Sequence, residues 1–105
     1  MNLHGKYESY DNVVFTRGTY EKGGTAVRVF CEDGEPIATL SVYIRGISET
    51  LFSNEFCFMD ASQNEGFLES MIANDLIEHT GRVLVSSRLH IVPIVRLKNL
   101  WKEIG

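Results

Sequence analysis

The side chains best suited to covalent or metal chemistry in this chain are two cysteines and three histidines. Cys31 and Cys57 each lie in an apolar run typical of a strand, where a reduced and buried thiol is the usual state. The histidines are scattered and form no H-x₃-H or C-x-x-C pattern of the kind that binds zinc. A nucleophilic pair of either cysteine with His79 or His90 remains an alternative, because such pairs meet in space rather than in sequence. We therefore expect no catalytic residue, no metal and no cofactor, and we do not expect an enzyme.

The carboxylates are the other candidates for chemistry, and they are unevenly distributed. Residues 46–80 contain seven acidic residues and no lysine or arginine, whereas residues 81–105 contain five basic residues and one acidic residue. The simpler interpretation is that the two segments are neighbours and neutralise each other. The alternative is an acidic patch that binds a basic partner, because surface charge steers association. The candidate patch consists of Glu65, Glu69, Asp75 and Glu78.

The element that organises the predicted fold is a β-hairpin from Thr25 to Ile44. Two alternating runs of strand formers flank Asp33-Gly34, which suits the positive φ angles of a two-residue type I′ turn. This turn pairs residue 28 with residue 39, residue 29 with residue 38 and residue 30 with residue 37. A slip by one residue would divide the apolar side chains between two faces, so we expect a well-determined register. The predicted apolar face contains Val27, Val29, Leu40 and Val42.

A first strand, Asn12 to Tyr20, is predicted to join this hairpin through a turn at residues 21–24. Its simplest register places two rows of side chains on the other face of the sheet. Facing arginines repel each other, so something negative is expected nearby. We expect the chain itself to cover this face; a partner-binding surface is the alternative. The first row is Phe15, Phe30 and Ile37, and the second is Arg17, Arg28 and Thr39.

The same face has the residue types of a single-strand nucleic-acid reader. Aromatic rings stack on bases, and arginines contact phosphates. A pI of about 5.3 argues against a dedicated binder, since phosphate neutralisation supplies most of the affinity. Nucleic-acid binding is therefore the alternative to protein binding. The residues of this alternative site are Phe15, Arg17, Arg28, Phe30 and Tyr43.

The second half of the chain is predicted to supply one helix and three further strands. A short strand covers residues 55–60, and a helix follows it. Ser62 and Glu65 have the spacing of a capping box, and the helix continues to about Asp75. Strands at 82–86 and 89–97 follow, and Pro93 restricts the last one to a sheet edge or a bulge. The order β-β-β-β-α-β-β predicts an α+β fold, an antiparallel β-sheet meander with one main amphipathic helix.

Length and composition limit the class of protein. A chain of 105 residues with 44% hydrophobic residues and a net charge of −4 fits a single soluble domain, residues 1–105. The first residues lack the apolar core of a signal peptide, and no apolar run approaches the length of a membrane span. Together with two cysteines that make no disulfide framework, these features predict a cytoplasmic protein.

Short motifs in the second half resemble a family of small uncharacterised proteins carried by bacterial phages, plasmids and conjugative elements. The shared pattern is a short strand ending in Asp, a polar turn, a helix ending near an asparagine, a Thr-Gly step and a strand containing proline. The last feature corresponds to Pro93. The resemblance is carried by residues 59–64, by Phe67-Leu68-Glu69, by Asn74-Asp75-Leu76 and by Thr80-Gly81-Arg82.

The resemblance implies a mobile-element context, in which small acidic proteins often inhibit host defence. It implies a non-catalytic protein-binding module, of the anti-CRISPR or anti-restriction type, that occludes a host nuclease or its guide complex. An acidic protein can occupy a basic groove meant for nucleic acid without catalysing a reaction. The expected partner is thus a protein, with single-stranded nucleic acid as the alternative.

Overall fold

The computed structural model describes residues 2–6, 8–59, 64, 66–85 and 91–98, and it arranges their strands in three antiparallel sheets. An N-terminal ribbon pairs β1 (Leu3–His4) with β2 (Ser9–Tyr10). The hairpin sheet contains β3 (Val14–Thr19), β4 (Thr25–Phe30) and β5 (Pro36–Thr39) in that order. The C-terminal sheet has the order β6 (Glu55–Cys57), β8 (Ile91–Leu97) and β7 (Ile77–Val85). A short 3₁₀ helix, η1 (Ser48–Thr50), precedes β6, and α1 (Phe67–Ala73) precedes β7.

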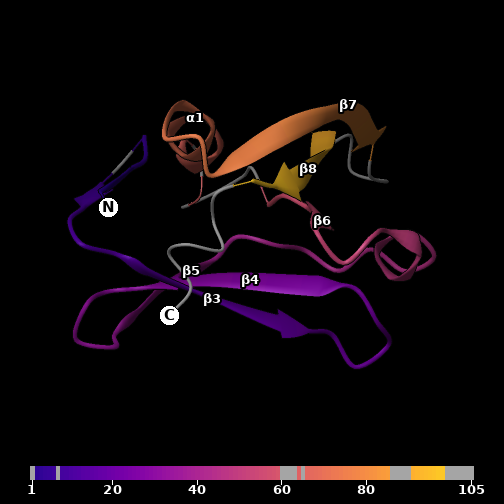
Figure 1. Cartoon of the computed structure of the whole chain (residues 1–105), viewed down its shortest axis with the longest axis horizontal. Coiled ribbons are helices and arrows are strands. Elements are labelled where there is room, and N and C mark those ends of the chain that lie inside the picture. The colour runs from indigo at the N-terminus through magenta and orange to yellow at the C-terminus, as the bar shows by residue number, and fades with distance from the viewer. Residues whose placement is uncertain (1, 7, 60–63, 65, 86–90, 99–105) are drawn as a thin grey trace.

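The predicted α+β class is confirmed in its coarse form, because antiparallel sheets and one α-helix make up the described elements. The predicted single meander is wrong. After β5 the chain leaves the hairpin sheet and crosses to the C-terminal sheet, which lies above it (Figure 1). There Ser41 forms an isolated bridge with Phe58, and the Met59 N–H donates to the Leu40 carbonyl at 2.7 Å. Two layers form instead of one because both sheets have an apolar face to bury.

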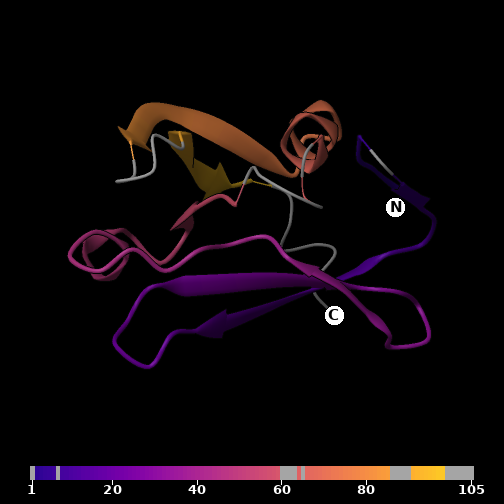
Figure 2. The ribbon, with the colours of Figure 1, turned by 180° about the vertical axis from the view of Figure 1, so that it is seen from behind.

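The core lies between the two sheets and extends under α1. The hairpin sheet contributes Val27 and Val29, which are fully buried as the sequence predicts. The C-terminal sheet contributes Phe56 and Val95, and α1 contributes Met71. Figure 2 shows the same layers from behind, with α1 beside the N-terminal ribbon. Each such side chain contributes about 1.5–3 kcal/mol when it is fully buried.

The predicted register of the first strand is wrong by one residue. Phe15 pairs with Val29 rather than Phe30, and Arg17 pairs with Val27 rather than Arg28. The loop after β3 has three residues instead of four, since Tyr20 and Gly24 close it with a 2.9 Å hydrogen bond from the Tyr20 N–H to the Gly24 carbonyl. A shift of one residue exchanges the faces of a strand. Phe15 is therefore a core residue that is 1% exposed.

The turn of the central hairpin also differs from the prediction. Cys31 and Glu35 close a three-residue loop in which only Gly34 has a positive φ, 95°, and the Gly34 N–H donates to the Cys31 carbonyl. This is a type I turn followed by a left-handed glycine, the second common hairpin solution. Phe30 consequently pairs with Pro36, not with Ile37, and a bulge beside Val29 restores the predicted pairs of residues 29 and 38 and of residues 28 and 39.

The helix is shorter than predicted. It begins at Phe67 after Gly66, whose φ is 92°, and ends at Ala73. Ser62 and Glu65, the predicted capping box, lie outside the described residues. The sequence predicts that Phe67, Met71 and Ile72 belong to the apolar face of this helix. Phe67 and Met71 are buried, whereas Ile72 is 40% exposed.

The C-terminal hairpin begins at Ile77, earlier than the predicted strand start at residue 82. The turn that the sequence also suggests at His79-Thr80-Gly81 therefore lies inside β7. There the register shifts between His79 and Val83, and Gly81 has a φ of 87°. Pro93 pairs with Val83 at the end of this shift, in the central strand of its sheet. The edge alternative for Pro93 is thus wrong, and the bulge that adjoins Pro93 lies in β7 rather than in the strand of Pro93 itself. The sequence also predicts a short helical turn from Asn99 to Gly105, which lies outside the described residues.

Candidate functional surfaces

The four residues of the predicted acidic patch have different surroundings. Asp75 Oδ1 lies 2.6 Å from Lys98 Nζ, and Glu78 Oε1 lies 3.2 Å from Arg96 Nη1. These ion pairs join the acidic segment to the basic segment, as the neutralisation interpretation predicts. Glu69 is exposed on α1, and Glu65 lies outside the described residues.

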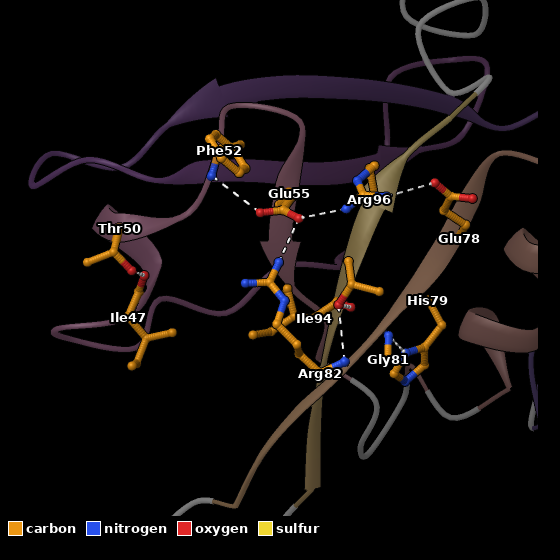
Figure 3. A network of polar contacts seen from close by, with 11 residues as sticks. Ile47, Thr50, Phe52, Glu55, Glu78, His79, Gly81, Arg82, Ile94 and Arg96 are labelled. Atoms are coloured by element: carbon orange, nitrogen blue, oxygen red, sulfur yellow. Dashed lines mark hydrogen bonds and ion pairs between the residues drawn. The ribbon is translucent and has the colours of Figure 1, made fainter.

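A second polar network centres on Glu55, whose side chain is 1% exposed (Figure 3). Glu55 Oε2 accepts hydrogen bonds from Arg82 at 2.6 Å and from Arg96 at 3.3 Å. Its other oxygen accepts the Phe52 N–H at 3.4 Å. Burial by itself raises the pKa of the Glu55 carboxyl, but the hydrogen bonds and charges of the arginines outweigh it and hold this pKa below its ordinary value.

The bulge in β7 is what brings Arg82 to Glu55. Gly81 supplies a left-handed residue there, and the Thr80 hydroxyl donates to the Ile94 carbonyl at 2.7 Å, which replaces a regular ladder contact. The Gly81 N–H donates to His79 Nδ1 at 2.8 Å. Bulges commonly redirect a side chain in this way. Both carboxylate oxygens of Glu55 accept hydrogen bonds. The network therefore connects β6, β7 and β8 and has a structural role.

The cysteines have the surroundings of structural thiols. Burial raises the pKa of Cys57, against a lesser lowering by the Ser48 hydroxyl. The pKa of Cys31 is raised by burial and by the nearby carboxylates of Asp33 and Glu35. A nucleophilic cysteine needs the opposite shift. Within the described residues, no three histidine, cysteine or acidic side chains gather in a way that could hold a metal ion.

The β4–β5 turn forms an acidic surface that is not among the sites expected from the sequence. Glu32, Asp33 and Glu35 are all exposed, and none forms an ion pair with another described residue. Burial is the main cause of the raised pKa of the neighbouring Cys31 thiol, and the negative charges of Asp33 and Glu35 raise this pKa further. The sequence already shows this surface as three acidic residues within four positions, EDGE at residues 32–35. We call these three residues the acidic turn.

The alternative nucleic-acid site is only partly assembled. Phe15 lies in the core on the opposite side of the sheet, and the Arg17 guanidinium donates to the Ser53 carbonyl at 3.1 Å. The Tyr43 hydroxyl donates to Glu49 at 2.6 Å, and the Tyr43 ring lies 5.5 Å from that of Tyr20. Arg28 and Phe30 remain on the outer face of the hairpin sheet. Arg28 aligns there with the two threonines opposite it, Thr16 on β3 and Thr39 on β5.

The distal part of the β7–β8 hairpin exposes aliphatic side chains. Val83, Val85 and Ile91 are 50%, 65% and 66% exposed. Val85 pairs directly with Ile91, so the two side chains lie together on one face. We call these three residues the aliphatic arm. Exposed apolar groups that are contiguous often mark contact sites.

No protein-family model matches this sequence, and comparisons with curated proteins and with solved structures also found no match. No helix among the described residues has the length and apolar character needed to cross a membrane. The functional argument therefore rests on the surfaces described above.

Proposed function

We propose that this protein acts by binding another protein and does not catalyse a reaction. In the mobile-element context that the sequence motifs imply, the partner is a host defence nuclease or its guide complex, of the kind that anti-CRISPR and anti-restriction proteins inhibit. The protein would occlude a basic groove that normally holds nucleic acid.

The observation that carries this proposal is the acidic turn. Its three carboxylates are exposed and lack ion-pair partners among the described residues, so their charge is directed to the solvent. In the predicted patch, by contrast, Asp75 and Glu78 already have basic partners. Unpaired acidic groups on a turn raise association rates with a basic groove, and this contribution falls as salt is added.

The proposal is tested by phage infection of a host with an active CRISPR or restriction system, with and without this protein. We expect the protein to restore infection. A double variant of the turn, Glu32→Lys with Glu35→Lys, should abolish the effect. Asp33 is left unchanged because its Oδ1 accepts the Glu35 N–H at 3.0 Å and shapes the turn.

Three comparison variants identify the contact. Glu21→Lys changes the charge of an exposed acid on the β3–β4 turn and should have no effect. Glu69→Lys tests the helix surface, and Val85→Lys tests the aliphatic arm. If Glu69→Lys or Val85→Lys no longer restores infection while the turn variant restores it fully, the contact lies away from the acidic turn. If the unaltered protein restores infection in none of the CRISPR or restriction systems tested, the proposal is overturned.

A further inference from the structure

Arg28 lies between two hollows on the outer face of the hairpin sheet. One hollow has a volume of about 330 Å³, and its lining includes Gly18, Tyr20 and Ala26. The other has a volume of about 260 Å³ and is lined by Phe30, Pro36 and Thr39. Arg28 lines both of them. Each hollow is therefore lined by one aromatic residue, Tyr20 or Phe30, and the Arg28 side chain lines both.

This part of the surface has a positive character in a protein of net charge −4. Among the described residues that line the two hollows, none is Asp or Glu, whereas Arg17 lines the first hollow in addition to Arg28. No hydrogen bond or ion pair joins the Arg28 side chain to another residue of the described ranges. Among the described elements, none lies over the outer side of β3, β4 and β5 (Figures 1 and 2). Its charge is thus complementary to an anionic ligand.

Gly18 is the residue that the fold does not explain. A Cβ at this position would meet no atom within 4 Å, and the backbone φ there is not positive. Neither packing nor backbone conformation therefore requires glycine, although glycine weakens a strand. A strand glycine of this kind often marks a place where a ligand approaches the backbone closely. Here the absent side chain keeps the first hollow open.

We propose that this face binds single-stranded nucleic acid, with a phosphodiester against Arg28 and one base in each adjacent hollow. Strands are about 4.8 Å apart, so hollows on the two sides of a β4 residue are separated by roughly two strand spacings. Stacking of successive bases on aromatic side chains beside a cation is the usual mode of single-strand recognition. Tyr20 and Phe30 supply the two rings, and Thr16 and Thr39 supply hydroxyl groups beside Arg28.

This inference goes beyond the proposed function and does not depend on the acidic turn. The measurement is fluorescence anisotropy of labelled oligothymidine and oligouridine, about eight nucleotides long, over a salt series. Arg28→Ala should weaken binding about tenfold at low salt and reduce the slope of log K against log salt by about 0.7, as expected for one lost phosphate contact. Phe30→Leu should also weaken binding about tenfold through lost stacking.

Gly18→Val separates an effect on ligand binding from an effect on stability. A β-branched residue fits a strand better than glycine, so the thermal midpoint should stay the same or rise, while the filled hollow weakens oligonucleotide binding at least tenfold. Arg45→Ala is the matched charge control, because Arg45 is exposed and lines neither hollow. It should leave binding within twofold of the unaltered protein.

Three outcomes would overturn the inference. The first is no change in anisotropy up to about 100 µM protein, the weak limit of non-specific binding. The second is an equal loss of affinity for Arg28→Ala and Arg45→Ala, which would indicate diffuse charge rather than a site. The third is binding of polyglutamate in preference to the oligonucleotides, which would identify an acidic protein segment as the ligand.

Discussion

Arg82 reaches the buried carboxylate of Glu55 from a bulge in β7, with Arg82 Nη2 2.6 Å from Glu55 Oε2. The two residues are 27 positions apart in sequence and belong to different strands of the C-terminal sheet. Arg96, on the strand between them, is bonded to the same oxygen at 3.3 Å. One carboxylate thus joins all three strands of this sheet.

Glu55→Gln should lower the free energy of unfolding by about 2–3 kcal/mol, because removing one member of a buried pair leaves its partners without compensation. The loss should fall below the usual range for buried pairs, since both arginine side chains are roughly half exposed to water. Urea unfolding at neutral pH measures it. Glu69→Gln, an exposed acid of α1, should change stability by less than about 0.5 kcal/mol. Equal effects of the two substitutions would mean that the network contributes nothing.

The same carboxylate should make the fold sensitive to acid. The folded-state pKa of Glu55 lies below its ordinary value of 4.5, so the unfolded chain takes up the proton at a higher pH than the folded one. The stability that Glu55 contributes is complete above about pH 4.5 and is lost as the pH falls through the lowered pKa. Across this acidic range, the free energy of unfolding should therefore depend less on pH for Glu55→Gln than for the unaltered protein. If the free energy of unfolding depends on pH to the same extent in both proteins, Glu55 is not a source of the acid sensitivity.

Gly66→Ala should destabilise the protein by more than about 2 kcal/mol, for two reasons. The residue has a φ of 92°, and an added Cβ would lie 2.7 Å from the Lys6 backbone nitrogen. Gly34→Ala separates the two effects, because Gly34 has a φ of 95° but open space around it. It should cost only the backbone strain, about 1–2 kcal/mol. Thermal unfolding of both variants gives the difference, and equal losses would show that the contact with Lys6 is unimportant.

Phe15→Ala should cost about 3–5 kcal/mol, as expected for a fully buried aromatic side chain. Val14→Ala, at the neighbouring position on the opposite face, is the comparison, because Val14 is 39% exposed. It should cost less than about 1 kcal/mol. This pair tests the register of β3 directly: under the register expected from the sequence, Val14 would be the core residue and the two losses would be reversed.

The sequence predicted the parts of the fold that depend on strand alternation. The burial of Val27, Val29 and Leu40 and the pairing of residues 28 and 39 follow from the alternation of the two β-strands around Asp33-Gly34. The error at β3 arose from loop length, since a loop of three residues and one of four are both compatible with Glu21-Lys22-Gly23-Gly24. Periodicity within a strand cannot distinguish its two faces when both carry apolar and polar residues, as in VVFTRGT.

The candidate surfaces were harder to predict, because they depend on which charged side chains form ion pairs in the folded protein. Asp75 and Glu78 look like solvated acids in the sequence, and their partners Lys98 and Arg96 are 23 and 18 residues away. The burial of Glu55 depends on a bulge that Thr80-Gly81 signals only weakly. The acidic turn could have been found from its local density of carboxylates. The two hollows beside Arg28 could not, because they need the correct register of three strands.

The seven residues of α1 are too few to form a stable helix alone, so this helix depends on what packs against it. Part of that support comes from the start of the chain, where the His4 N–H donates to Ser70 Oγ at 3.1 Å and the Tyr10 ring contacts Phe67. His4 precedes Ser70 by 66 residues. During translation, the contact between the N-terminal ribbon and α1 can therefore form only after all of the intervening hairpin sheet has been synthesised.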